Sequence, residues 1–469
     1  MRIPLASKSD PAKREIVSDE KLINLYAEQA PSGAKADFAL YRTEGHRSFS
    51  LASDELCRGL FPFGDELIGV FGSDVLSFDT EGNFTIEGTV AGSDDVQFSR
   101  NDAVTAQLAI VIPDTGAVYK YENSAVSLIS DADLGDIIDS EHVDGYQLMI
   151  EADGTLQYST LNDLDEYDAL DFVTAEGDPD GLLAIKRNGD DIFLFGVKTT
   201  EVFRHVDDSD NPFQRVKGAV LPVGIINKYA KCEVGGILCW VDNHGIVRKR
   251  GASYNPDPIS NSGVQKDIAD LEDKETIRVF GFIEDGHGFF TVRSPFWSWT
   301  YDFKEQRWHN RASSQRNTWK AKHYARFANK HIIAGDQEGG LFYLDPDYGF
   351  ENGERIVWEA TLPPLSKFPN GFSAFGFDLD IECGTAMDSS EDESDQEPMI
   401  TLYASIDGGK SFNSMGTRSL GTRGQYRKQV RWPRLGKYGR EGAVFKISGS
   451  SGAVQAIMAA DLVSAPRAA

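Results

Sequence analysis

Apolar and polar residues alternate along most of the chain in short runs that are separated by tight polar turns. The alternation has a period of two residues, which is typical of a β-strand with one buried face. Turns such as Asp153-Gly154 and Asp285-Gly286 contain residues that tolerate the positive φ angles of tight hairpins. Only two short stretches, near Gln265–Lys274 and Asp163–Ala169, have a pattern that would suit a helix. The pattern therefore predicts an all-β protein built from antiparallel strands.

These runs recur with a period of roughly 40 to 50 residues, which is characteristic of propellers and some solenoids. Each unit contains an apolar run, a turn, and one or two further alternating runs. The units begin at Glu66, Ala106, Gly145, Leu182, Gly235, Val279 and Lys330. Small antiparallel sheets arranged radially would leave only short, protected edges. We therefore expect a β-propeller of six to seven blades over residues 61–355, preceded by an N-terminal arm and lead-in strand over residues 1–60.

The pattern changes after residue 355, where prolines at positions 363, 364 and 369 interrupt the chain. Five well-formed strands follow, in the segments FGFDLDIEC, MITLYASID, QVRWPRLG, AVFKISGS and QAIMAADLVS. Their alternation predicts a C-terminal β-sandwich over residues 356–469. The acidic segment 386–398 is expected to be an exposed loop between the first two of these strands.

Charge is strongly segregated along the chain of 469 residues, whose formal net charge is −26. No Lys or Arg occurs between Lys120 and Lys186, where acids are dense. The stretch Thr417–Arg440 has eight basic residues and no acid. Opposite fields on one subunit suit head-to-tail or layered assembly, although either run alone could be ordinary solvated surface.

No pattern of cofactor or metal binding is found, so we expect neither. The eight histidines include no HExxH motif, and the four cysteines are expected to be reduced and mostly buried: Cys57, Cys232, Cys239 and Cys383. No apolar run of eighteen residues would span a bilayer, and the N-terminal residues lack the apolar core of a secretory signal. We expect a protein that is made and folded in a cytoplasm, without membrane insertion.

Enzymatic motifs are equally scarce, so no catalytic residue is assigned and the chain is expected not to be an enzyme. Ser405–Phe412 resembles the Asp-box turn of sialidases, but the box is not repeated and no arginine triad accompanies it. One alternative remains a polysaccharide depolymerase or sialidase-like hydrolase. Another is a cellular propeller scaffold for peptides or glycans, although no WD or Kelch signature is present.

Several segments resemble the packaged-DNA stabilisation, or tail hub (nozzle), proteins of short-tailed bacteriophages. These are INLYAEQAP (Ile23–Pro31) followed by LYRTEGHRSF (Leu40–Phe49), the long segment Asp180–Val241, and VRWPRLGKYGREGAVFKIS (Val430–Ser448). Glu44 stands where the family pattern usually has proline.

The resemblance implies a structural virion protein of the phage tail. Such a protein forms a ring, here taken as a hexamer, beneath the portal and its head-to-tail adaptor. The ring closes the channel so that packaged DNA is retained until ejection. Tail fibres or spikes and a tail needle would attach to it, and translocating DNA would touch it only passively.

Two sets of charged residues are candidate functional sites. A carboxylate-rich channel wall would repel DNA phosphates, so the candidate channel-facing acids are Asp131, Asp133, Asp136, Asp163, Asp165 and Glu166. The candidate subunit or adaptor interface consists of Arg418, Arg423, Arg427, Arg431, Arg434 and Arg440. Because Tyr426, Trp432 and Tyr438 lie among these arginines, direct contact with nucleic acid is the alternative to a strand that packs in a core and binds protein.

Overall fold

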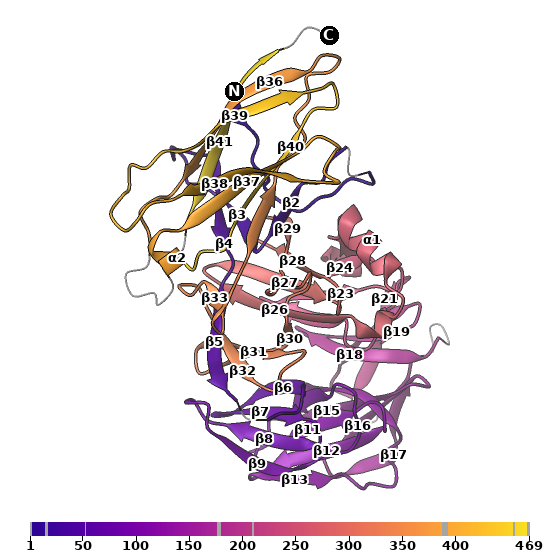
Figure 1. Ribbon diagram of the computed structural model, residues 1–469. Coiled ribbons are helices and arrows are strands. Elements are labelled where there is room, and N and C mark those ends of the chain that lie inside the picture. Colours follow the sequence, from indigo (N-terminus) through magenta and orange to yellow (C-terminus); the bar gives the residue numbers. More distant parts are fainter. Residues whose placement is uncertain are drawn as a thin grey trace.

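The computed structural model describes residues 2–14, 17–51, 53–175, 180–208, 211–386, 393–453 and 455–466, with only the backbone of Ser253, Glu393 and Ser394. Figure 1 shows a ring of small sheets below and a layered β-structure above. The predicted all-β fold, a propeller followed by a C-terminal sandwich, is confirmed. Helices are limited to α1 (Ser262–Asp270), the short α2 (Glu393–Gln396) and the 3-10 turns η1 (Ala252–Tyr254) and η2 (Lys274–Thr276).

Seven four-stranded antiparallel blades make up the propeller. The first three blades are β6 (Cys57–Phe63), β7 (Glu66–Phe71), β8 (Asp74–Phe78) and β9 (Phe84–Thr89); β10 (Gln97–Arg100), β11 (Leu108–Ile112), β12 (Ala117–Glu122) and β13 (Ala125–Leu128); and β14 (Ile137–Val143), β15 (Tyr146–Glu151), β16 (Thr155–Ser159) and β17 (Tyr167–Thr174). The next two are β18 (Leu182–Asn188), β19 (Asp191–Gly196), β20 (Thr200–His205) and β21 (Phe213–Leu221); and β22 (Lys231–Val234), β23 (Ile237–Val241), β24 (Val247–Arg250) and β25 (Pro256–Pro258). The last two are β26 (Arg278–Glu284), β27 (His287–Arg293), β28 (Ser298–Asp302) and β29 (Arg307–Asn310); and β30 (Ala321–Phe327), β31 (Lys330–Gly335), β32 (Leu341–Asp345) and β5 (Gly45–Ser50).

The first strand of each blade lies innermost and contacts the first strand of the next blade, and the circle closes between β30 and β6. Hairpin turns follow the predicted chemistry, because Asp285 (φ 48°) and Gly286 (φ 78°) both adopt positive φ between β26 and β27. The predicted helical stretch near Gln265 is α1, whose first turn is capped by Asn261. The stretch Asp163–Ala169 is not a helix but a loop followed by the first residues of β17.

An N-terminal strand completes the seventh blade. β5 pairs antiparallel with β32, in a register that runs from Gly45 opposite Asp345 to Ser50 opposite Leu341. The next strand along the chain, β6, opens the first blade, so the seam between blades seven and one joins segments far apart in sequence. Phe49, Leu67 and Ile332 belong to the apolar cluster that fills this seam. Residues 1–60, expected as an arm and lead-in strand, thus contribute directly to the propeller.

The sandwich consists of two sheets and draws strands from both ends of the described chain. One sheet has the order β3 (Leu25–Gln29), β4 (Phe38–Arg42), β41 (Ile457–Pro466), β36 (Phe372–Ile381) and β39 (Val430–Tyr438), and β1 (Arg2–Ile3) pairs with β41. The other has the order β2 (Lys21–Ile23), β35 (Trp358–Thr361), β40 (Val444–Gly449), β37 (Met399–Ser405) and β38 (Asn413–Ser419). Two short strands, β33 (Phe350–Glu351) and β34 (Glu354–Arg355), lie at the edge of the seventh blade.

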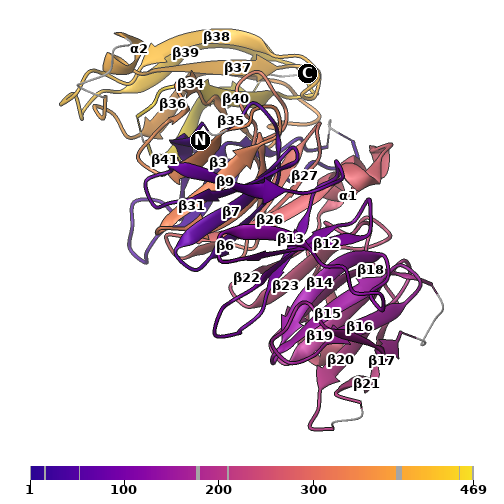
Figure 2. The same ribbon diagram turned by 90° about the horizontal axis from the view of Figure 1, so that it is seen from below.

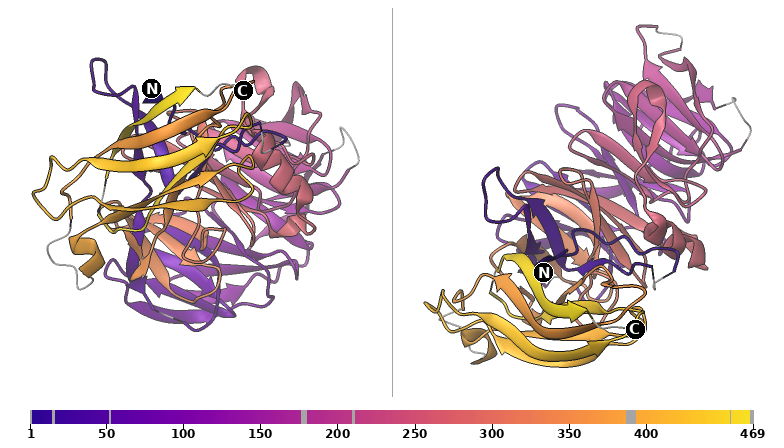
Figure 3. Two further views of the ribbon diagram at one scale, coloured as in Figure 1. Left: turned by 45° about the horizontal axis from the view of Figure 1, so that its top comes forward. Right: turned by 90° about the horizontal axis from the view of Figure 1, so that it is seen from above.

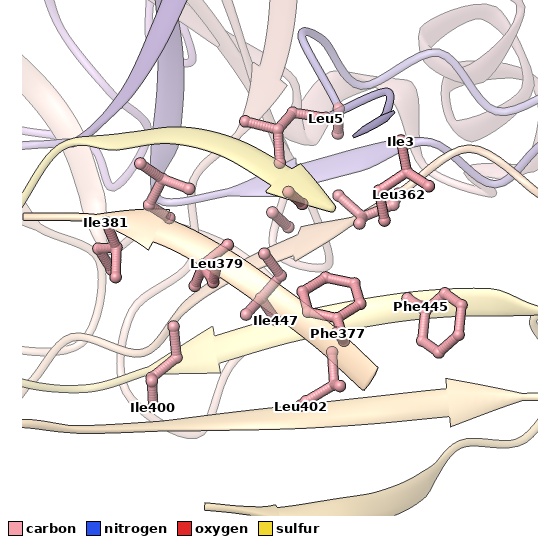
Figure 4. Packing of buried hydrophobic residues seen from close by; sticks show 14 of the residues in the cluster. Ile3, Leu5, Leu362, Phe377, Leu379, Ile381, Ile400, Leu402, Phe445 and Ile447 are labelled. Atoms are coloured by element: carbon pink, nitrogen blue, oxygen red, sulfur yellow. The ribbon is translucent and has the colours of Figure 1, made fainter. Parts of the chain in front are cut away.

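The sandwich core lies between these sheets (Figure 4). Phe377 of β36 points toward Phe445 of β40, and their ring centroids are 5.5 Å apart. Ile3 and Leu5 from the N-terminal segment join the same core. The five strands predicted for this part are β36, β37, β39, β40 and β41. Most of their apolar side chains are buried, but Phe375, Met399 and Val463 are exposed.

β2 joins the two parts of the molecule. It pairs with β29 of the sixth blade on one side and with β35 of the sandwich on the other, which creates one nine-stranded sheet. Asn24 follows β2, and its amide nitrogen donates to the carbonyls of Ala312 and Val357 at 2.7 and 2.8 Å. These bonds link the sandwich to the propeller. The right panel of Figure 3 shows the two parts side by side.

Candidate functional site

The bore of the propeller is a concave site to which every blade contributes. Its cavity of about 490 Å³ is lined by residues on or next to all seven innermost strands, among them Leu60, Gln97, Ser140, Ile185 and Tyr324. This volume falls in the range of small-molecule pockets, roughly 300–1,000 Å³. Charged side chains line it from six of these strands or the residues beside them.

A cluster of cations surrounds Asp95 on one side of the bore. The Nε of Arg278 and the Nζ of Lys322 each lie 2.5 Å from a carboxylate oxygen of Asp95, and His323 Nε2 lies at 3.4 Å. Burial raises the pKa of the Asp95 carboxyl, but His323, Arg278 and Lys322 outweigh it and hold this pKa far below its usual value. The carboxylate is therefore ionised at neutral pH. Arg278 also stacks on Tyr229, with its guanidinium carbon 3.9 Å from the ring centroid.

Two further ion pairs occupy the opposite wall. Lys231 lies 2.6 Å from Asp139, and Lys186 lies 2.6 Å from Glu141. Burial raises the pKa of Asp139 despite Lys231. For Glu141 burial acts in the same direction, but Lys186 outweighs it and lowers the pKa. The charges of the bore are thus largely matched within the chain itself, as buried charges must be.

The candidate channel-facing acids lie on connecting segments of blades two and three and are not among the residues that line the bore. Asp131, Asp133 and Asp136 belong to the connection between β13 and β14. Asp163, Asp165 and Glu166 belong to the loop between β16 and β17. The two segments touch, because the backbone N–H of Tyr167 donates to Asp131 at 3.1 Å. Lys120 forms an ion pair with Asp165.

The basic stretch forms one exposed edge of the sandwich. Arg418 lies on β38, Arg423 and Arg427 on the loop that follows, Arg431 and Arg434 on β39, and Arg440 just beyond it. Trp432, Leu435 and Tyr438 alternate with these residues and are buried in the core. Trp432 donates through Nε1 to the carbonyl of Gly416 at 2.7 Å. The interpretation as a strand with an apolar core face is therefore confirmed, and the aromatic group left at the surface of this stretch is Tyr426.

The predicted acidic loop 386–398 is only partly described, since residues 387–392 lie outside the described ranges. Its later part forms ion pairs with other segments of the chain. Asp395 is buried and lies 2.9 Å from Arg355, and Glu397 lies 3.4 Å from Lys428 in the basic stretch. The expectation of an exposed loop is therefore wrong for Asp395.

The resemblance to an Asp-box corresponds to a tight turn between β37 and β38. Asp407 accepts hydrogen bonds from the backbone N–H and hydroxyl of Ser411 at 3.0 and 2.6 Å and from the hydroxyl of Ser405 at 2.7 Å. These bonds lower the pKa of Asp407. The Asp407 carboxylate therefore stabilises this turn.

Within the described residues, no group of three or more His, Cys, Asp or Glu side chains could hold a metal ion. The four cysteines are free thiols, and all but the half-buried Cys232 are buried. No helix in the described part of the chain is long and apolar enough to cross a membrane.

Sequence reasoning did not identify the bore residues. One sequence signal could have identified them, namely charged residues within the first strand of a repeat. Examples are Asp139-Ser140-Glu141, Lys231-Cys232-Glu233 and Lys322-His323. Charges at such positions are unusual in a buried strand unless they have partners. The partners come from other blades, so spacing along the chain does not show them.

Seven four-stranded blades, closed by an N-terminal strand and joined to a sandwich, define the chain as a β-propeller protein. The family model described as "Bacteriophage P22 Gp10, beta-propeller", named for phage stabilisation, matches residues 1–349. The chain belongs to this family, as the resemblance implied, and is a bacteriophage structural protein of the tail hub and stabilisation type.

Other comparisons add little. No curated protein matches the sequence. Among solved structures, the computationally designed Ika8 protein is 10% identical with a TM-score of 0.39, over 64% of this chain and 100% of that one. The WD40 propeller domain of Doa1 is 11% identical with a TM-score of 0.38, over 65% and 96% of the two chains. PorZ of the Porphyromonas gingivalis type-IX secretion system is also 11% identical with a TM-score of 0.38, over 72% of this chain and 45% of PorZ.

Proposed function

We propose that the chain is a non-enzymatic subunit of a homohexameric ring in the tail hub, or nozzle, below the portal and its head-to-tail adaptor. The ring closes the tail channel and retains packaged DNA until ejection. It also anchors tail fibres or spikes and receives the tail needle. Family membership supports the tail location.

The small size of the propeller bore is the observation that supports the ring. Ion pairs between blades occupy its cavity, whose volume of about 490 Å³ is that of a small-molecule pocket. No duplex passes through a space of this kind. This supports the proposal that a DNA channel is enclosed by several copies, with the propellers forming its wall.

The acidic surface of blades two and three suits that wall. Asp133, Asp136 and Glu166 are exposed, and carboxylates that face a channel repel the phosphate backbone. DNA would then slide through without adhering. We assign Asp131, Asp163 and Asp165 to the same wall, which makes the contact with DNA passive.

The basic edge of the sandwich suits a protein interface between subunits or toward the adaptor. Its core-facing aromatic residues are not available to stack on bases. Arginine is also common in protein interfaces.

Native mass spectrometry and electron microscopy of the purified full-length chain test this proposal. We expect a closed ring of six copies that docks on the adaptor. The same preparation, incubated with host polysaccharide, should leave the chain length of the polysaccharide unchanged. A protein that stays monomeric at every concentration, with or without adaptor, contradicts the ring, and shortened polysaccharide contradicts the non-enzymatic role.

A further inference from the structure

The outer edge of the third blade exposes apolar side chains. β17 is the outermost strand of this blade and pairs on one side only, with β16. Leu170 and Phe172 on this strand are 82% and 45% exposed. Two large apolar side chains this close together on an unpaired strand favour a contact with another protein surface.

The same strand has acids that lack a cation. Asp168 and Asp171 lie beside the two apolar residues, and neither forms an ion pair within the described chain. Burial and the charge of Asp168 raise the pKa of Asp171. A cation from outside would relieve this repulsion. We call Asp168, Leu170, Asp171 and Phe172 the acidic docking surface.

The sandwich offers the complementary set of residues. Tyr426 is 70% exposed, and Arg427, Arg434 and Lys437 are exposed on or beside β39. These three cations have no ion pair among the residues that the structure describes. We call Tyr426, Arg427, Arg434 and Lys437 the basic docking surface.

The two docking surfaces lie at opposite ends of the molecule. β17 is at the far end of the propeller and β39 at the far end of the sandwich in Figure 1, and Figure 2, turned by 90°, shows the same separation. One copy therefore cannot bring its own surfaces together. Two different patches on one subunit make a head-to-tail contact, and such contacts close into rings when the rotation between copies permits.

We propose that the acidic docking surface of one copy binds the basic docking surface of the next, so that ion pairs and an apolar contact join the subunits head to tail. This inference rests on the ring proposed above and specifies which surfaces form it. Leu170 and Phe172 would pack against Tyr426 and the aliphatic parts of the arginines, and Asp168 and Asp171 would face Arg427 and Arg434. Opposite charges at such a contact steer association and fix the register of the partners.

Charge reversal followed by mixing tests the proposal without added adaptor. One variant combines Asp168→Lys with Asp171→Lys, and the other combines Arg427→Glu with Arg434→Glu. Each variant alone should remain monomeric, or need at least about tenfold more protein for half-assembly, because like charges then meet. An equimolar mixture should assemble again, since each reversed surface now finds an opposite one on the other variant. Native mass should show strictly alternating rings with equal numbers of the two chains.

Matched reversals elsewhere serve as controls. Glu272 and Lys266 are exposed beside and on α1, so Glu272→Lys and Lys266→Glu should assemble like the unaltered protein. Circular dichroism and melting temperature verify that each variant is folded. Rings that survive both reversals, or variants that fail alone and do not recover on mixing, overturn the pairing of these surfaces while leaving the ring itself standing. An unaltered chain that never forms rings contradicts the proposed function instead.

Discussion

At the scale of single residues, buried charges hold the junction between propeller and sandwich. Arg311 is 3% exposed, donates to the Glu44 carboxylate at 2.9 Å and lies over the Trp319 ring at 3.6 Å. Arg311→Met removes the partner of a buried carboxylate, so we expect a loss of about 3–5 kcal/mol in the free energy of unfolding. A shift of the denaturant midpoint measures it.

Two controls separate the buried charge from packing. Adding Glu44→Gln to Arg311→Met should recover much of the loss, because no unpaired charge then remains. Arg440→Ala removes an exposed pair with Glu441 and should change the midpoint little. A double variant as unstable as Arg311→Met alone contradicts the role assigned to the charge.

Residue patterns predicted the buried and exposed faces of β39 but not the bore residues, for one physical reason. The alternation of Arg431, Trp432 and Leu435 is local, so the buried and exposed faces of β39 follow from sequence. Asp95 finds Arg278 and Lys322 across 183 and 227 residues. Such pairs arise only from the closure of the ring, and a single sequence contains no measure of that closure.

At the scale of elements, the seam between blades seven and one depends on β5. Phe49 on this strand packs against Phe327 of β30, with ring centroids 6.4 Å apart. Phe49→Ala should cost about 3–5 kcal/mol. Hydrogen exchange should quicken in β6–β8 and β30–β32, which share the apolar cluster with Phe49, and remain slow in blade four.

Phe296→Ala, in the turn between β27 and β28 of blade six, is the matched control, because Phe296 is exposed and lies outside this apolar cluster, so exchange at the seam should stay unchanged. If hydrogen exchange became faster in all seven blades alike, the role of β5 would not be confined to the seam.

The strand pattern of β5 is too short to identify its partner. Residues Gly45–Ser50 alternate weakly, and pairing with β32 is a contact between distant segments. The repeats between them were predictable because each blade forms from neighbouring strands. The contribution of β1 to β4 to the sandwich escaped prediction for the same reason as the role of β5.

At the scale of the whole molecule, buried histidines couple folding to pH. Burial lowers the pKa of His46 to about 2 and that of His309 to about 3, with Arg311 acting in the same direction on both. The unfolded chain takes up these protons near pH 6.5, so it binds more protons than the folded chain below that pH. Stability should therefore fall as the pH drops from 6.5 toward 3, by about 1.4 kcal/mol per pH unit for each histidine. His287 acts oppositely, because Asp302 raises its pKa against the effect of burial, and its contribution is lost as the pH rises.

Melting temperatures between pH 7 and pH 5 measure this dependence. His309→Asn should reduce the dependence of the melting temperature on pH by roughly the contribution of one histidine. His244→Gln, at an exposed turn, should leave the slope unchanged. An unaltered slope in His309→Asn contradicts the neutral, buried state of His309.

The closing of both parts by N-terminal strands has a consequence for biosynthesis. β5 leaves the ribosome early, but its residue Ser50 pairs with Leu341, which is synthesised 291 residues later. At about 5–20 residues per second the strand waits roughly 15–60 s for that partner. β1 waits longer still, for Asp461. Neither the propeller nor the sandwich can be finished during most of translation, so a chain that stops before β41 exposes unpaired strands and becomes a substrate for proteases instead of entering an assembling virion.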